Sequence, residues 1–324
     1  MATDDRPARL QVGVLLPTRE ALFTADSSAA PLLAMSERAE ALGFDSLWVG
    51  DSLTARPRFE PLTMLAAVAA RTRRVALGTA VLLPALRNPV LLAHAVATVD
   101  RLAEGRLILG VGLGNKSEES QAEFRAAGVP FEHRASRLSE LLRVCRALWS
   151  EEKVTHEGRF WNFEGVAVLP KPHRKGGPPI LVGGGGPLML KLTAAAADGW
   201  FPNIADLATL KAGWEQIGAA AQAAGRSRAG IGMTFYVTLN VQSDRRQAEE
   251  ALRGFMERYY HRPYEVLAKR QACYAGDGEG AVSWLRPFVE AGVRHVVVRF
   301  GGADQAAQLE RIGRDLLPRL HALG

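Results

Sequence analysis

The sequence alternates short apolar runs with stretches of helical spacing, and this alternation constrains the fold more than any other feature. Apolar runs bounded by turn residues predict strands, whereas apolar residues that recur every three or four positions predict helices. The predicted strands are Leu10–Leu16, Phe44–Gly50, Val75–Leu82, Leu107–Gly112, Pro179–Val182, Gly199–Pro202, Met233–Val241 and Val293–Phe300. The predicted helices are Ala30–Leu42, Pro61–Ala70, Pro89–Leu102 and Arg137–Trp149. Strands that alternate with helices indicate parallel βα units.

Eight such strands favour a closed (β/α)8 barrel in a single α/β domain, residues 1–324. The nearly continuous apolar character of the strands fits burial on both faces of a parallel sheet. Between the fourth helix and the fifth strand we expect an insertion over residues 151–178, with a hairpin at Val154–Leu169. The alternative is an open doubly wound sheet with a dinucleotide site at Gly110–Gly114, although that weak motif lies in the fourth strand and its helix is delayed by a loop.

Composition narrows the class of protein. The sequence has no apolar run of eighteen residues, and its N-terminus (MATDDRPARL) is too polar for a signal peptide, so we expect a soluble, cytoplasmic protein without a membrane partner. Lys and Arg outnumber Asp and Glu by 40 to 34, and the excess is spread along helices, which argues against nucleic-acid binding. A second interpretation is that some arginines line a pocket for an anionic ligand. Only Cys145 and Cys273 are present, and no metal site is visible.

The segment Ile180–Pro202 contains four consecutive glycines, Gly183 to Gly186, between a predicted strand and a helix. Glycines let the backbone approach an anion, and Pro187 fits the first helical position, where unpaired N–H groups and the positive end of the helix dipole collect. The segment therefore has two interpretations, a phosphate-binding turn or an ordinary loop.

Active-site residues of a (β/α)8 barrel follow the C-terminal ends of its strands. Those positions hold few acid–base groups in this sequence, and the histidines are scattered. Glycine-rich strand ends without their own reactive groups are typical of an enzyme whose cofactor carries the chemistry.

Five blocks of the sequence carry a resemblance to a known family. They are Arg38–Asp51, Pro61–Val81, Arg87–Gly114, Glu123–Arg137 and Pro178–Trp200. In their content and order the chain resembles the luciferase-like flavin and deazaflavin oxidoreductases. The resemblance implies a (β/α)8 barrel with an insertion, usually assembled as a homodimer. It also implies a reduced cofactor, FMN or coenzyme F420, at the C-terminal ends of the strands.

The resemblance further implies site residues. The family pattern places a bulge, often with a non-proline cis peptide, behind the cofactor ring at Thr79, Ala80 and Val81, with Ala80–Val81 as the expected cis pair. It places Gly112, Gly114 and Asn115 along the ribityl chain or phosphate, and Gly183, Gly184, Gly185 and Gly186 as backbone donors to the phosphate. Many relatives carry a histidine where this chain has Ser52. That departure leaves two alternatives: Glu20, Asp51 and His133 are the candidate catalytic residues, or the role of the histidine is not essential to this chemistry.

Two activities fit this pattern on a small organic substrate. With FMN reduced by a separate reductase, the enzyme would be a monooxygenase; with the deazaflavin, it would transfer hydride. The block Glu123–Arg137 and the arginines Arg56, Arg58 and Arg87 favour the polyanionic F420 slightly. A catalytically silent flavin-binding relative is the non-enzymatic alternative. A phosphate-metabolising barrel without flavin would need clustered lysines or carboxylates at the strand ends, which the sequence lacks.

Overall fold

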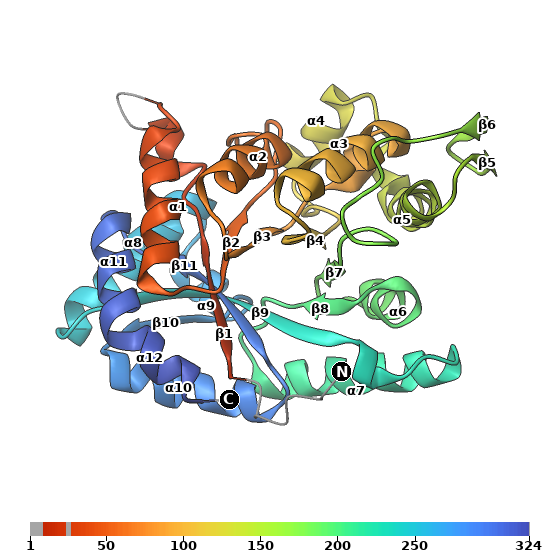
Figure 1. Cartoon of the computed structure of the whole chain (residues 1–324). Coiled ribbons are helices and arrows are strands. Elements are labelled where there is room, and N and C mark those ends of the chain that lie inside the picture. Colours follow the sequence, from red (N-terminus) through yellow and green to blue (C-terminus); the bar gives the residue numbers. More distant parts are fainter. Residues whose placement is uncertain (1–8, 24–26, 324) are drawn as a thin grey trace, which may run out of the picture. The chain divides into compact units, whose positions relative to one another are not determined.

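The computed structural model describes residues 9–23 and 27–323 (Figure 1). Its strands are β1 (Gln11–Leu15), β2 (Ser46–Val49), β3 (Ala76–Thr79), β4 (Leu107–Val111), β5 (Val154–Glu157), β6 (Asn162–Val166), β7 (Ile180–Gly183), β8 (Gly199–Phe201), β9 (Gly232–Val241), β10 (Cys273–Gly276) and β11 (His295–Phe300). Its α-helices are α1 (Ala30–Leu42), α2 (Pro61–Arg71), α3 (Pro89–Leu102), α4 (Glu118–Ala126), α5 (Arg134–Ser150), α6 (Pro187–Ala196), α7 (Leu207–Ala223), α8 (Arg245–Tyr260), α9 (Tyr264–Ala268), α10 (Gly278–Glu290), α11 (Gln305–Arg311) and α12 (Leu317–His321). Most of the polar N-terminal segment considered above, residues 1–8, lies outside the described residues.

The order of these elements is that of a (β/α)8 barrel, as predicted. The eight barrel strands are β1 to β4, β7 to β9 and β11, and each is followed by at least one helix. The barrel strands are short and almost wholly buried; β2 and β11, for example, have no exposed residue. Burial of this kind is expected for parallel strands that are covered by helices.

The described chain forms two compact units. The first unit comprises residues 9–16, 37–47 and 183–323, and the second comprises residues 17–36 and 48–182. In the first unit β1 and β9 both pair in parallel with β11, and β9 also pairs with β8 and β10. In the second unit β4 pairs in parallel with β3 and with β7, while β5 and β6 form an antiparallel hairpin.

One strand was not predicted. Between the seventh and eighth barrel strands the structure has β10, which pairs with the end of β9 (Gly276 opposite Val241), whereas β8 pairs with its beginning (Trp200 opposite Met233). The eight predicted barrel strands are confirmed, and β10 is an additional strand that pairs with β9. β10 is only four residues long, and three of them are half-buried, so it lacks the apolar run by which the other strands were recognised.

The segment after β4 also differs from its expectation. It contains the helix α4, which is not among the helices predicted above. The side chain of Ser117 accepts a hydrogen bond from the N–H of Ser120 at 3.3 Å and so caps the helix. Only Ser120, Glu123 and Phe124 of this helix are buried, which is too few to give a clear helical periodicity.

The expected hairpin in the insertion is confirmed, and a buried carboxylate organises its turn. Glu140 of α5 accepts hydrogen bonds from the N–H groups of Arg159, Phe160 and Trp161 at 3.1–3.2 Å and lies 3.2 Å from His156 Nε2. Burial alone would raise the pKa of Glu140, but the hydrogen bonds from His156 and from the turn lower it. The turn between β5 and β6 is thus held on α5 by an ionised side chain.

The second unit contains a close contact between a tryptophan and a glycine. Trp48 of β2 is fully buried, and its ring lies flat against Gly78 of β3. A Cβ atom at Gly78 would come within 2.2 Å of Trp48 Cε3, far inside van der Waals contact. Only glycine fits this position while Trp48 keeps its place.

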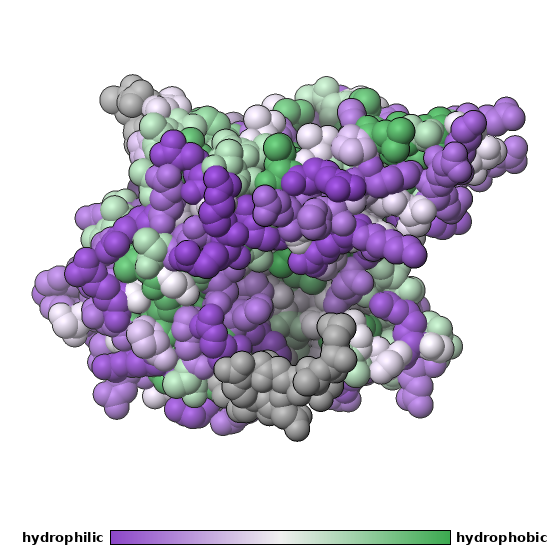
Figure 2. All heavy atoms as spheres, viewed as in Figure 1, coloured by the Kyte–Doolittle hydropathy of each residue, from purple (hydrophilic) through white to green (hydrophobic). Residues whose placement is uncertain are grey.

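The face of the molecule shown in Figure 2 is mostly polar. On the face shown in Figure 2, hydrophilic residues cover most of the area, and hydrophobic residues form small separate groups. No helix among the described residues is long and apolar enough to span a bilayer.

Candidate functional site

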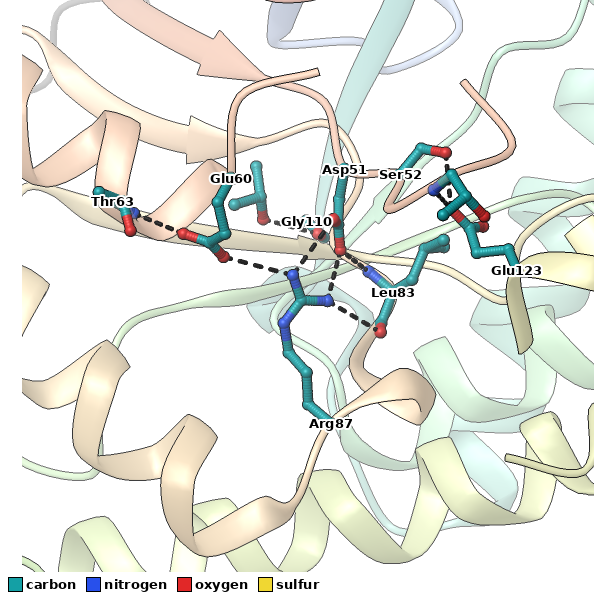
Figure 3. A network of polar contacts seen from close by, with 10 residues as sticks. Asp51, Ser52, Glu60, Thr63, Leu83, Arg87, Gly110 and Glu123 are labelled. Carbon is teal, nitrogen blue, oxygen red and sulfur yellow. Dashed lines mark hydrogen bonds and ion pairs between the residues drawn. The ribbon is translucent and has the colours of Figure 1, made fainter. Parts of the chain in front are cut away.

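The carboxylate of Asp51 connects the segments that follow β2 and β3. Its side chain is only 5% exposed. One oxygen accepts a hydrogen bond from the N–H of Leu83 at 2.8 Å and pairs with Arg87 Nη1 at 2.6 Å (Figure 3). The other oxygen accepts from Arg87 Nη2 at 3.2 Å. Both oxygens are therefore engaged, in the two-pronged geometry that arginine favours with carboxylates.

Arg87 lies between two carboxylates. Its Nη2 atom is 3.3 Å from Glu60 Oε1, and the other oxygen of Glu60 accepts the N–H of Thr63 at 2.7 Å, which caps α2. Burial alone would lower the pKa of Arg87, but the neighbouring charges of Asp51 and Glu60 raise it above its ordinary value. The guanidinium thus remains charged and joins α2 to the end of β2.

The residues expected behind the cofactor ring lie at the end of β3. The peptide bond Ala80–Val81 is cis, as predicted. The hydroxyl of Thr79 donates to the carbonyl of Gly110 at 2.7 Å, and the N–H of Ala80 donates to the carbonyl of Val49 at 2.7 Å. These bonds fix the bulge between the ends of β2 and β4.

The structure places Gly112, the residue that directly follows β4, against this bulge. A Cβ atom at Gly112 would lie 2.6 Å from Val81 Cγ2, so the two residues are in direct contact. Gly114 follows with a φ of +74°, a conformation that favours glycine, and Asn115 is exposed. Thr79, Ala80, Val81 and Gly112 therefore form one group in the second unit.

Gly183 to Gly186 lie in the first unit, at the end of β7. Gly184 has a φ of +100°, and its carbonyl accepts the indole N–H of Trp200 at 2.7 Å. Gly184, Gly185 and Gly186 are exposed, and among the described residues their N–H groups donate no hydrogen bond. These donors stand at the N-terminus of α6, where the helix dipole adds positive potential. The residues present thus fit the phosphate group of a cofactor.

An arginine at the end of β11 forms a further polar centre in the first unit. Arg299 is 3% exposed and donates to the hydroxyls of Thr238 and Tyr260 at 2.9–3.1 Å. Its guanidinium also lies 4.7 Å from the ring centre of Tyr259 and 5.8 Å from that of Tyr236. Arg299 lies within the eighth predicted strand, Val293–Phe300, and its aromatic surroundings were not visible in the sequence.

The three candidate catalytic residues have different surroundings. Asp51 is paired as described, Glu20 begins the 3-10 turn Glu20–Phe23 and is half-buried, and His133 lies 3.5 Å from Arg159 Nη2 and near the ring of Phe160. In the part of the chain that the structure describes, none of the three contacts another. Their catalytic roles stay predictions.

Sequence reasoning missed two carboxylates that hold the site together. Glu60 immediately precedes Pro61, the first residue of α2, and a proline at that position is a recognisable signal of a helix start. Glu123 of α4 accepts a hydrogen bond from the hydroxyl of Ser52 at 2.7 Å. The two residues are 71 positions apart, and no local sequence pattern predicts such a contact. Within residues 9–23 and 27–323 no group of three or more His, Cys, Asp or Glu side chains could hold a metal ion.

Comparisons with known proteins agree with this architecture. F420-dependent glucose-6-phosphate dehydrogenase from Nocardia farcinica is 32% identical over 307 residues, which cover 84% of this chain and 90% of that protein. The solved structure of an F420-dependent secondary alcohol dehydrogenase in complex with an F420–acetone adduct has a TM-score of 0.81 at 23% identity, covering 96% of this chain and 99% of that one. The monooxygenase RslO1 from Streptomyces bottropensis has a TM-score of 0.81 at 25% identity, covering 95% and 99%.

A family model described as "Luciferase-like monooxygenase" matches residues 10–309, nearly the whole chain. The match includes the bulge at Thr79–Val81 and the glycine turn at Gly183–Gly186, and the dehydrogenase from Nocardia is similar over most of the same length. The chain belongs to the luciferase-like monooxygenase family.

Proposed function

We propose that this protein is an F420-dependent oxidoreductase that transfers a hydride between the deazaflavin and a small organic substrate. The observation that carries the proposal is the turn Gly184–Gly186 at the start of α6, whose residues are exposed and whose N–H groups donate no hydrogen bond among the described residues. The carboxylate of Asp51 is engaged by Arg87 and Leu83, which supports a reaction whose reactive group is supplied by a cofactor.

Each predicted site residue has a role in this proposal. Gly183 to Gly186 donate N–H groups to the cofactor phosphate, Thr79, Ala80 and Val81 back its ring, and Gly112, Gly114 and Asn115 line its side chain. When bound, the deazaflavin supplies the hydride donor or acceptor, while the chain orients the ring and excludes water. We assign these residues to a single barrel domain, residues 1–324.

The similar proteins support F420 more than FMN. The curated relatives are named as F420-dependent glucose-6-phosphate dehydrogenases and are 30–33% identical to this chain. These names also favour an active enzyme over a catalytically silent flavin-binding protein. The second candidate is an FMN monooxygenase served by a separate reductase, and the likeness to RslO1 supports it.

Titration of the purified protein with F420 and with FMN, each oxidised and reduced, tests the proposal. Quenching of cofactor fluorescence measures the affinity. We expect F420 to bind more tightly than FMN, and reduced FMN to bind preferentially if the monooxygenase candidate is correct. Glucose 6-phosphate is the first substrate to assay with F420, because the curated relatives are named for it. Binding of neither cofactor would overturn the proposal.

We also propose that the protein is a homodimer. Leu91 and Leu102 of α3 are 71% and 54% exposed, and their spacing of three helical turns places them on one face of the helix. Leu169 is 70% exposed. It lies two residues before Lys171, whose carbonyl accepts a hydrogen bond from Arg101 of α3. Exposed apolar side chains in one region support a protein–protein contact.

A further inference from the structure

Glu123 is a buried carboxylate that binds a loop distant in sequence. Its side chain belongs to α4 and is 1% exposed. The single oxygen Oε1 accepts three hydrogen bonds: from the hydroxyl of Ser52 at 2.7 Å, from the N–H of Thr54 at 2.9 Å and from the N–H of Ala55 at 3.3 Å. All three donors lie in the loop that follows β2, residues 52–58, as Figure 3 shows for Ser52.

The hydroxyl of Ser52 extends this set of bonds to the rest of loop 52–58. It donates to Glu123 and accepts the N–H of Arg56 at 2.8 Å. The carbonyl of Arg56 then accepts Arg58 Nε at 3.2 Å, and the guanidinium of Arg58 lies against Gly50, where a Cβ atom would come within 2.0 Å of Nη1. These bonds connect Arg58, whose guanidinium lies at the end of β2, to Glu123.

Apolar packing contributes little to holding this loop. Leu53 is 58% exposed, and Thr54 is exposed as well. A loop without buried apolar side chains keeps one conformation only if polar contacts fix it. A buried carboxylate provides such a contact, because leaving its oxygen without donors is costly.

Loop 52–58 begins beside the group of residues assigned to the cofactor ring. Val49, the last residue of β2, accepts the N–H of Ala80 at 2.7 Å, and Asp51 accepts the N–H of Leu83 at 2.8 Å. The start of the loop is thus fixed by Asp51 and its body by Glu123, next to the bulge at Ala80–Val81.

We propose that Glu123 is a positioning residue of the reaction: it holds loop 52–58 over the edge of the cofactor site beside Ala80–Val81. Glu123 contacts neither cofactor nor substrate and acts only through Ser52, Thr54 and Ala55. This role rests on the proposed function, because it presumes a bound cofactor at Ala80–Val81.

Hydrogen exchange of the cofactor-free protein tests the hold on the loop. In the native chain we expect the N–H groups of Thr54 and Ala55 to be protected, because both donate to Glu123. We expect Glu123→Ala to speed their exchange by about tenfold. Glu123→Gln keeps an acceptor oxygen and is expected to restore part of the protection. The control is Glu118→Gln on the exposed side of the same helix, which should exchange like the native protein.

Accessibility of the bound cofactor tests the positioning role. Iodide quenches the fluorescence of bound F420 or FMN in proportion to its exposure, and this readout does not require turnover. With Glu123→Ala we expect a several-fold larger quenching constant than with the native protein, an intermediate value with Glu123→Gln, and the native value with Glu118→Gln. A purely structural role for Glu123 would leave this constant unchanged.

The outcomes separate the two proposals. Unchanged exchange at Thr54 and Ala55 in Glu123→Ala would show that Glu123 does not hold the loop. Faster exchange with unchanged iodide quenching would overturn the positioning role and leave the proposed function intact. A native protein that binds neither F420 nor FMN would overturn the proposed function and the positioning role together, while the exchange experiment would still decide whether Glu123 fixes loop 52–58. Exchange that rises throughout Glu123→Ala would count against a local role, and Ser52→Ala then provides the milder variant, for which faster exchange confined to loop 52–58 is expected.

Discussion

An acidic residue at the end of a barrel strand can have a catalytic role or a structural one, and Asp51 is an example. Asp51 was a catalytic candidate because it follows a barrel strand. In the structure both of its oxygens are engaged, by Arg87 and by the N–H of Leu83. Asp51 therefore joins the segments that follow β2 and β3 through an ion pair and a backbone hydrogen bond.

Replacing Asp51 tests this view. Asp51→Asn removes the ion pair and leaves the half-buried Arg87 without its main counter-charge, so we expect a loss of about 2 kcal/mol in the free energy of unfolding. Urea denaturation of Asp51→Asn, Arg87→Met and the double variant measures the coupling between the two side chains. If Asp51 were instead a proton acceptor in the reaction, Asp51→Asn would abolish activity without lowering stability.

At the residue scale, the buried side chain of His295 is also expected to make the stability of the fold depend on pH. Burial lowers its pKa to about 4 from an ordinary value of 6.5, with a smaller opposing influence of Asp45, and its Nε2 lies 2.7 Å from the hydroxyl of Ser46. Between pH 6.5 and pH 4 the unfolded chain binds a proton at this side chain and the folded chain does not, so stability falls as the pH falls through this window. The expected loss is about 3 kcal/mol. Urea denaturation at several pH values should show a shallower decline for His295→Gln than for the native protein, and parallel curves would contradict the assignment.

At the scale of elements, the glycine turn before α6 combines conformation and function. Gly184 has a φ of +100°, which an alanine adopts only with strain. Gly184→Ala is therefore expected to lower stability by about 1 kcal/mol and to weaken cofactor binding about tenfold, because the turn would relax and redirect its N–H groups. Gly278→Ala at the start of α10, where nothing lies within 4 Å of the added Cβ, is the matched control. Equal cofactor affinity in both variants would show that the turn is not part of the cofactor-binding site.

The sequence predicted elements well where the signal is local. The eight barrel strands were placed within a few residues of their observed bounds, because buried parallel strands are continuous apolar runs. β10 and α4 were missed, since the first is four residues long and half-buried and the second is mostly polar. The cis peptide Ala80–Val81 was predicted from the family resemblance. The contacts of Glu123 with loop 52–58 could not be predicted from the sequence. They join residues about 70 positions apart, and nothing in either segment specifies the other.

At the scale of the whole molecule, the exposed leucines of α3 lead to a prediction about self-association. We expect the native protein to be a dimer at micromolar concentration in light scattering, and the double variant Leu91→Asp, Leu102→Asp to be a monomer, because the two charges would lie on the apolar face. Val266→Asp, at a 40% exposed position on α9, is expected to remain dimeric. A native protein that is monomeric at these concentrations would refute the dimer.

The contact between Trp48 and Gly78 bears on how proteins of this kind diverge. Any side chain at position 78 collides with the indole, so a change there is tolerated only after Trp48 has become smaller, and a smaller residue at position 48 leaves a cavity until position 78 has grown. Either single step lowers stability, and only the pair together restores packing. Across related sequences the two positions should therefore vary jointly, with a large aromatic residue at one accompanied by glycine at the other. Paired substitutions in the neighbouring strands β2 and β3 would then reveal a packing constraint that neither position shows alone.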